Sequence, residues 1–225
     1  MLITLVIIGI VAALTIPNLL QKHQEQTTVK KVQKFYSTLS NAYSLAMKEN
    51  GPASEWGLTG YNEESALKIY EVLIKPYFKI AKDCGVNNEG NCIINNRYNN
   101  LKNKEYASYG KTTTEEFYKV TLDDGSAVWL RSNNLTGTKA DVFYDANGKK
   151  GPNAWGKDLF SFILYNDKVY PGGLPLYRNL TTEQANTRNR EYCSPNSDSK
   201  YNGLECTAWV VYKGNMDYLR KEIEW

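Results

Sequence analysis

The first 21 residues carry no charged side chain, and this segment constrains the fold of the chain more than any other. It reads MLITLVIIGIVAALTIPNLLQ, and the first charge belongs to Lys22. A helix needs about 20 apolar residues to cross a bilayer, so nearly the whole segment would be used. A cleaved signal peptide has a basic start, a shorter apolar run and a small-residue cleavage site. Because these features are missing, we expect residues 1–21 to form a retained helix that is embedded in a membrane or packed against other helices.

The sequence after Gln21 becomes polar but keeps a helical pattern. Apolar side chains recur every three or four positions on one face, at Val29, Val32, Tyr36, Leu39, Tyr43 and Ala46. No glycine or proline interrupts residues 18–50, and the stretch Asn50-Gly51-Pro52 is a strong stop signal. We therefore expect one helix of roughly 70 Å, at 1.5 Å per residue, with an amphipathic second part over residues 22–50. Pro17 is expected to kink it.

The four cysteines form two close pairs, each separated by a polar sequence rich in turn residues. Four cysteines allow three connectivities, and short loops close at the least entropic cost. This favours the pairs Cys84–Cys92 and Cys193–Cys206. A four-cysteine zinc site is the rival, but it usually needs closer spacing within each pair. Disulfides would place the head of the protein in an oxidising compartment outside the cytoplasm.

Residues 51–225 are expected to form one α+β head. The segment 63–82 predicts a helix that is broken near Pro76, with Leu67, Tyr70, Leu73 and Ile74 on its apolar face. Patterns typical of strands occur at 117–122, 126–131, 140–145, 158–165 and 206–213. The first two are joined by Asp123-Asp124-Gly125, which is a hairpin signal. A helix followed by antiparallel strands indicates the α+β class.

The N-terminal stretch resembles the prepilin-type segment of type IV pilins and of type II secretion pseudopilins. The matching parts are Leu2-Ile3-Thr4-Leu5, Ile8-Gly9-Ile10-Val11-Ala12-Ala13 and Ile16-Pro17, within about the first 20 residues. The resemblance implies a long helix packed on a small antiparallel sheet. It also implies that residues 1–21 line a filament core, where the small side chains at Gly9, Ala12 and Ala13 allow close helix packing.

The front end of this segment departs from the family pattern. Family members begin with a short basic leader that ends in Gly, followed by a sequence like F-T-L-x-E. A prepilin peptidase cuts the leader, and the glutamate aids docking of the subunit. Met1 lies just past the place of that glutamate, so we expect the reading frame to begin upstream, with the peptidase as a partner. Lysines follow the apolar run and oppose an outward-facing head under the positive-inside rule. We follow the cysteine pairs instead, because a missing basic leader would distort this charge count.

The stretch 145–158 is a candidate calcium loop between two predicted strands. It opens as Asp145-Ala-Asn147-Gly148, like a calcium loop, but lacks the complete D-x-[DN]-x-[DN]-G-x₅-E pattern. Loops of this kind occur in secretion pseudopilins, and some bind calcium. That likeness implies Asp145, Asn147, Asn153 and Asp158 as ligands. The alternative is an Asx and glycine turn without an ion, and we place it ahead of the metal site.

We expect no enzymatic activity. The only histidine, His23, lies beside the apolar segment, which excludes a histidine-based triad in the head. Neither a phosphate-binding G-x-x-x-x-G-K-[ST] loop nor a G-x-S-x-G motif is present. The net charge of +3 comes from 27 basic and 24 acidic residues, and this balance does not predict binding to nucleic acid.

The sequence therefore favours a structural subunit of a type IV pilus-like or type II secretion pseudopilus filament. Such a subunit is a single-pass protein of the inner, or cytoplasmic, membrane with an extracytoplasmic head. It then joins like subunits and other pilins in a cell-surface or periplasmic filament. A charged residue at Ile8 or Ala12 is expected to abolish assembly while the head stays folded. One alternative is a membrane-anchored binding module that does not polymerise, and another is a secreted enzyme with a signal peptide.

Overall fold

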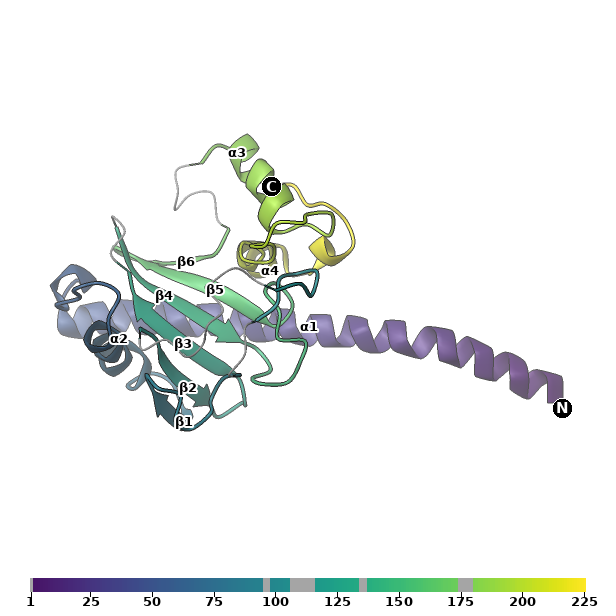
Figure 1. The fold of residues 1–225 in the computed structure, drawn as a ribbon, viewed down its shortest axis with the longest axis horizontal. Helices are drawn as coiled ribbons and strands as arrows, with labels where there is room; N and C mark the ends of the chain where they lie inside the picture. Colours follow the sequence, from purple (N-terminus) through teal and green to yellow (C-terminus); the bar gives the residue numbers. More distant parts are fainter. Residues whose placement is uncertain (1, 95–97, 106–115, 134–136, 174–179) are drawn as a thin grey trace.

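The structure is a computed structural model that describes residues 2–94, 98–105, 116–133, 137–173 and 180–225. For residues 2–12, 14, 18 and 138 the description covers the backbone alone. One long helix, α1 (Leu2–Asn50), projects from a head built around a single sheet (Figure 1). Its 49 residues continue through Pro17 without a break, so the predicted long helix is confirmed.

The second part of α1 buries one face in the head. Val29, Val32, Leu39, Tyr43 and Ala46 are buried, as their spacing predicts. A buried neighbour, Phe35, stacks on Tyr144 of the sheet with ring centroids 4.1 Å apart. Wherever side chains are described, no helix is both long enough and apolar enough to span a membrane.

The sheet has six antiparallel strands, and each strand pairs with its neighbours in the sequence. They are β1 (Ile80–Gly85), β2 (Tyr118–Leu122), β3 (Ala127–Ser132), β4 (Thr138–Asp145), β5 (Leu159–Tyr165) and β6 (Val169–Pro171). The predictions for β2 to β5 and for the hairpin between β2 and β3 are confirmed. With α1 packed against this sheet, the head is α+β as expected.

Both faces of the sheet are buried. One face packs on α1 through side chains such as Leu122, Val142 and Phe162. The other face carries Trp129 and Phe143, which lie opposite each other on β3 and β4. Loop residues including Ile93, Tyr98 and Trp155 cover this second face. Two-sided burial explains why all six residues of β3 are buried rather than alternating with exposed ones.

The predicted helix over 63–82 is wrong in its second part. Helix α2 (Glu63–Ile69) runs into a π-helical turn, η2 (Tyr70–Ile74), and the chain then forms β1 from Ile80. The predicted break near Pro76 is confirmed, because the helical part ends at Ile74. The prediction for Leu67 is also wrong, because this side chain is exposed, whereas Tyr70, Leu73 and Ile74 are buried.

The predicted strand over 206–213 is also wrong, because this segment is helix α4 (Thr207–Lys213). Its β-branched and aromatic side chains favour a strand, but packing on α1 overrides that preference. The side-chain amide of Gln33 donates to the carbonyl of Val211 at 3.0 Å, and Val210 is buried. Gly214 then ends the helix in the left-handed conformation, with φ of 67°.

Three more helices occur in the described part of the chain. They are η1 (Ala53–Glu55), α3 (Thr182–Tyr192) and η4 (Asp217–Leu219). The C-terminal segment beyond α4 returns to α1, where Arg220 binds the carboxylate of Glu25 through two hydrogen bonds of 2.7 and 2.9 Å. Tyr218 in this segment is fully buried and donates to the carbonyl of Gly156 at 2.7 Å. These contacts hold the C-terminus against the point where α1 enters the head.

Candidate functional site

The loop between β4 and β5 brings the four predicted calcium ligands together. Asp145 is the last residue of β4, and Asp158 comes directly before β5. Both carboxylates are buried, with 0% and 2% of the residue exposed. The backbone N–H of Ala146 donates to the carbonyl of Asp158 at 2.9 Å, which places the two ends of the loop side by side.

Hydrogen bonds to the two carboxylates shape this loop. One oxygen of Asp145 accepts from the hydroxyl of Tyr98 at 2.6 Å, and the other accepts from the backbone N–H of Asn147 at 3.1 Å. The carboxylate of Asp158 accepts from the backbone N–H groups of Asn153 and Ala154, both at 2.7 Å. These are the contacts of an Asx-type turn, so the loop is organised without an ion.

The two carboxylates disfavour each other's charge. Burial, and then the charge of Asp158, raises the pKa of Asp145 well above its usual value. Burial raises the pKa of Asp158 to about 6, although the N–H groups of Asn153 and Ala154 oppose the shift. Nearby Lys157 interacts with the charge of Asp158, but its ammonium donates to the side chain of Asn103 at 2.9 Å rather than to a carboxylate. The site would therefore gain from either a proton or a cation.

Two amide oxygens make calcium a chemically suitable cation. The Oδ1 atoms of Asn147 and Asn153 are buried and have no hydrogen-bond partner. Calcium prefers carboxylate and amide oxygens, so the two aspartates and the two asparagines match it in donor type. In the described part of the chain, no group of three or more His, Cys, Asp or Glu residues is placed to hold a metal. Binding would thus depend on the asparagines as well as the aspartates.

Tyr98 belongs to this site but was not predicted from the sequence. Its hydroxyl is bonded to Asp145 across 47 residues of chain, and its ring packs on Trp129 at 5.3 Å. Burial raises the pKa of Tyr98 well above its usual value, and the charge of Asp145 adds to this shift. The tyrosine therefore stays protonated and acts as a hydrogen-bond donor to the carboxylate. A sequence pattern carries no signal for a contact of this range.

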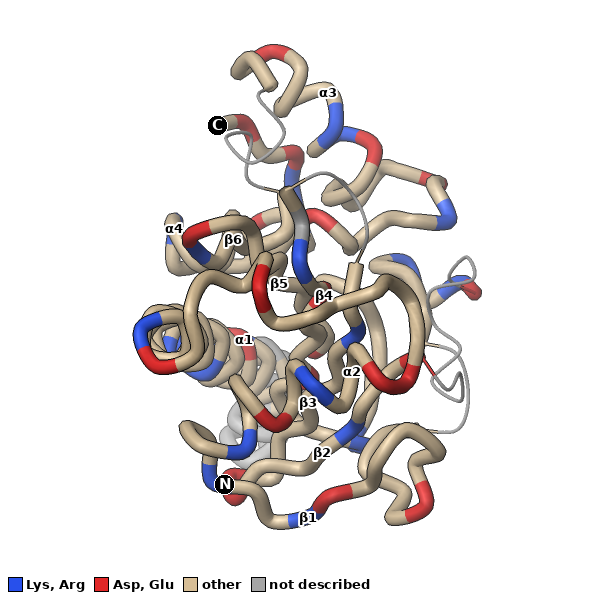
Figure 2. Tube along the Cα trace, turned by 90° about the vertical axis from the view of Figure 1, so that its left-hand side faces the viewer, with Lys and Arg blue, Asp and Glu red and all other residues tan. Residues whose placement is uncertain are grey.

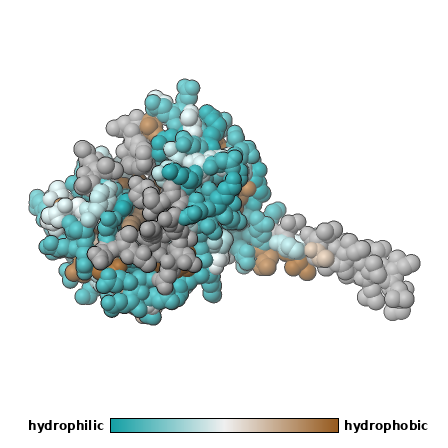
Figure 3. Space-filling model, viewed as in Figure 1, coloured by the Kyte–Doolittle hydropathy of each residue, from teal (hydrophilic) through white to brown (hydrophobic). Residues whose placement is uncertain are grey.

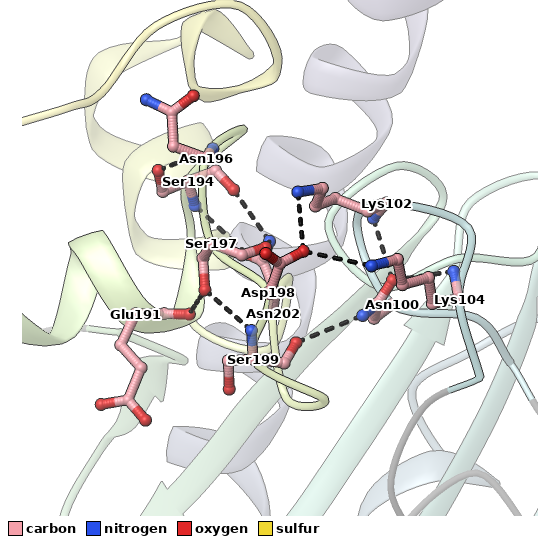
Figure 4. A network of polar contacts seen from close by, with 10 residues as sticks. All are labelled: Asn100, Lys102, Lys104, Glu191, Ser194, Asn196, Ser197, Asp198, Ser199 and Asn202. Carbon is pink, nitrogen blue, oxygen red and sulfur yellow. Dashed lines mark hydrogen bonds and ion pairs between the residues drawn. The ribbon is translucent and has the colours of Figure 1, made fainter.

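Both predicted disulfides are present, Cys84–Cys92 and Cys193–Cys206. The second one closes a polar loop, and Asn202 organises its interior. The side chain of Asn202 accepts from the backbone N–H of Ser194 at 3.2 Å and donates to the carbonyls of Ser194 and Ser197 at 2.8 and 3.0 Å. The loop is thus rigidly shaped by its own polar groups (Figure 4).

A second loop is bound to this disulfide loop. The carboxylate of Asp198 accepts from Lys102 at 2.9 Å and from Lys104 at 3.1 Å, as Figure 4 shows. The side chain of Asn100 donates to the carbonyl of Ser199 at 3.2 Å. The contacts join two parts of the chain that are about a hundred residues apart. They form a polar surface shared by the two loops. The described residues of these loops contain neither a histidine-based triad nor a phosphate-binding or G-x-S-x-G motif.

A groove beside α1 has a volume of about 260 Å³. Phe35, Phe78 and Tyr144 form an aromatic part of its lining, and lysines and aspartates lie around them. Ligand pockets usually hold about 300–1,000 Å³, so this groove is small for that role. Because both lysines and aspartates line the groove, its charge favours neither anionic nor cationic ligands.

The projecting part of α1 carries exposed apolar side chains. Ile16, Leu19 and Leu20 are exposed to 61%, 71% and 54%. They form a hydrophobic patch on the helix outside the head (Figure 3). Of the predicted filament residues, Ala13 and Pro17 are also exposed, whereas the side chains of Ile8, Gly9 and Ala12 lie outside the described ones.

Comparisons with known proteins identify a family without assigning an activity. No curated protein and no solved structure matches the chain. The model of one family, described as a family of unknown function (DUF6613), matches residues 18–215. This match covers the embedded part of α1, the whole sheet, the loop at 145–158 and both disulfides. The chain therefore belongs to DUF6613, a family of unknown function.

Proposed function

We propose that this chain is the structural subunit of a filament of the type IV pilus or type II secretion pseudopilus kind. The observation that carries the proposal is the single helix α1, which is embedded in the head at one end and projects with exposed apolar side chains at the other. A helix that exposes Ile16, Leu19 and Leu20 has a continuous apolar surface to bury. Packing against the same helix of like subunits buries it.

Burial of these side chains would contribute favourable free energy to filament assembly. Fully burying one Leu or Ile side chain is worth about 1.5–3 kcal/mol. The resemblance adds small residues at Gly9, Ala12 and Ala13, which would let neighbouring helices approach closely. Before assembly, the same apolar segment would hold the subunit in the membrane. The head would then lie outside the cytoplasm, where the two disulfides persist.

Contacts between α1 and the head would fix the position of each head relative to the packed helices of the filament. The hydroxyl of Tyr43 donates to the carbonyl of Tyr165 at 2.7 Å, and the ammonium of Lys31 donates to the carbonyl of Ala146 at 2.7 Å. These bonds join α1 to the last residue of β5 and to the residue that follows β4. A head fixed in this way would repeat at the spacing that the packed helices set.

The proposal is tested by placing two charges on the projecting part of α1. In the full-length chain, Leu19→Glu/Leu20→Glu is expected to remove sheared cell-surface or periplasmic filaments, because buried unpaired carboxylates are costly. The matched control is Ser37→Glu/Asn41→Glu, which adds the same charges to exposed positions of α1 inside the head. Near-UV circular dichroism and intact disulfides would show that both heads are folded.

Two results would contradict the proposal. One is a normal yield of filaments from the Leu19→Glu/Leu20→Glu variant. The other is a wild-type chain that remains monomeric in the membrane of cells that assemble pilus-like filaments. The second result favours a membrane-anchored binding module that does not polymerise.

A further inference from the structure

Exposed apolar side chains gather at both ends of the embedded part of α1. Seven large apolar or tyrosine side chains are exposed in the described part of the chain. Three of them, Ile16, Leu19 and Leu20, lie where α1 projects from the head. We call this surface, together with Lys22, Lys30 and Lys34, the basic end.

Three others lie at the opposite end, where α1 stops and α2 begins to cover it (Figure 1). These are Leu45, Tyr61 and Leu67, exposed to 45%, 38% and 38%. We call this surface, together with Glu55, Glu63, Glu64 and Glu71, the acidic end. Ile16 and Leu45 are separated by about 40 Å along the helix, at 1.5 Å per residue.

The two ends carry opposite charge. Residues 22–34 contain four lysines and one glutamate, and that glutamate, Glu25, is already bound by Arg220. Residues 48–71 contain five glutamates and two lysines. Figure 2 looks at the molecule from the α2 side, where acidic and basic residues are interspersed. Each end thus combines exposed apolar side chains with an excess of one sign of charge.

The charges at both ends form no ion pairs within the described part of the head, although the charge of Lys34 helps to lower the pKa of Asp124. Among the ion pairs that the described residues form with one another, none includes Lys22, Lys30 or Lys34, and none includes the four glutamates of the acidic end. The acids closest to the basic end are in the β2–β3 turn, where Asp124 already accepts bonds from Ser126. The three lysines of the basic end and the four glutamates of the acidic end are all exposed to solvent.

We infer that the basic end of one copy binds the acidic end of the next copy, in a head-to-tail contact along α1. The partner is a second copy of this chain, because the same molecule presents both complementary surfaces about one head length apart. A contact between two different surfaces does not close on itself and generates open helical assemblies. The inference rests on the proposed function and adds a second contact, between heads, to the packing of the projecting helices.

Several charges must act together in such a contact. A single exposed ion pair contributes little and is screened by salt, whereas a set of matched charges sets the register of the partners. The exposed apolar side chains of the acidic end would be buried by the same contact. Wild-type filaments are therefore expected to be shorter and fewer when they are sheared and washed at high salt than at low salt.

Charge exchange between the two ends tests the inference. We would compare Lys30→Glu/Lys34→Glu, Glu63→Lys/Glu64→Lys and the combination of all four changes in the full-length chain. Each pair alone places like charges together and is expected to lower filament yield by about tenfold or more, whereas the combination restores it. The matched control is Lys82→Glu/Lys200→Glu, which makes the same change of charge at exposed positions outside both ends.

The outcomes separate this inference from the proposed function. If either charge pair assembles as well as the control, or if two defective pairs do not rescue each other in folded proteins, the ends do not meet and the inference fails. The filament proposal still stands in that case, provided that Leu19→Glu/Leu20→Glu abolishes assembly. If the wild type forms no filament, both fail. Insensitivity of wild-type filaments to salt would also contradict the contact.

Discussion

Asp145 and Asp158 lie next to each other beneath the loop that joins β4 to β5, and both carboxylates are buried. The hydrogen bonds that they accept come from Tyr98 and from backbone N–H groups. In the described part of the chain, neither carboxylate forms an ion pair with a lysine or an arginine. From two buried acids in this arrangement we expect the stability of the head to depend on pH and on calcium.

The first prediction concerns pH. Both acids have a pKa that is raised above the usual value of 3.8, to about 6 for Asp158, so the folded state binds more protons than the unfolded state above pH 3.8. Their contribution is fully present below that pH and is lost as the pH rises through 6 and beyond. The free energy of unfolding, measured with urea in the presence of a chelator, is expected to fall by about 2–3 kcal/mol over this range because of Asp158, and Asp145 adds to this fall.

The variant Asp145→Asn isolates this effect from other titrations. It removes the titration of Asp145 itself and keeps an oxygen for Tyr98 or Asn147 to bond. Its unfolding free energy should therefore lose much less between pH 4 and pH 7 than that of the wild type. Parallel pH curves for the two proteins would contradict the prediction.

The second prediction concerns calcium. At neutral pH, calcium is expected to raise the unfolding free energy, because an ion that binds only the folded state at 100 times its Kd adds about 2.7 kcal/mol. Asn147→Ala should weaken the effect, since it removes one of the buried amide oxygens that lack a partner. Asn196→Ala, in the other polar loop, is the matched control. Titration calorimetry that detects no calcium binding would leave the loop as a turn without an ion.

The third prediction concerns the disulfide Cys193–Cys206. Replacing both cysteines by serine is expected to lower the unfolding free energy by about 2–4 kcal/mol. The bond closes the longer loop, with a sequence separation of 13 against 8 for Cys84–Cys92, and it precedes α4, which packs on α1. The corresponding double serine variant at Cys84 and Cys92 should therefore cost less. If the two double serine variants lose the same unfolding free energy in urea, the anchoring of α4 does not contribute to stability.

The fourth prediction compares two glycines in the left-handed region. Gly203 has φ of 107°, and a Cβ atom there would lie 2.3 Å from the carbonyl oxygen of Trp155. Gly57 has φ of 72°, with no atom within 4 Å of the place of a Cβ. Gly57→Ala should cost about 1–2 kcal/mol from the backbone alone. Gly203→Ala should cost about 1–3 kcal/mol more, because the backbone of Trp155 must move. Similar melting temperatures for the two variants would refute the assigned clash.

The parts of the fold that were predicted correctly depend on local patterns. The spacing of Val29, Val32 and Leu39 reflects one buried helix face, and it is visible in any window of the sequence. The disulfide pairs follow from short loops, which need no knowledge of the fold. Strands β3 and β4 were found because their apolar runs are bounded by turn residues.

The parts that were missed depend on contacts between distant segments. Strand β1, with the sequence IAKDCG, is mostly exposed at the sheet edge, so it has no apolar pattern to detect. Helix α4 has the composition of a strand and becomes helical where it packs on α1. Helix α3 was missed although a signal exists, because Thr181 and Gln184 form a capping box that can be recognised in the sequence. The candidate calcium ligands were proposed together, but Tyr98 was not among them.

The packing of α1 along the sheet has a mechanical consequence. The buried face from Val29 to Ala46 follows the axis of the helix, and hydrogen bonds from Lys31 and Tyr43 lie toward its two ends. A pull on the projecting part of α1 would act along that axis, so it would load these contacts at the same time, in shear. Contacts that share a load resist rupture better than contacts that are peeled apart one by one. A head built in this way stays packed on α1 when the chain is under tension.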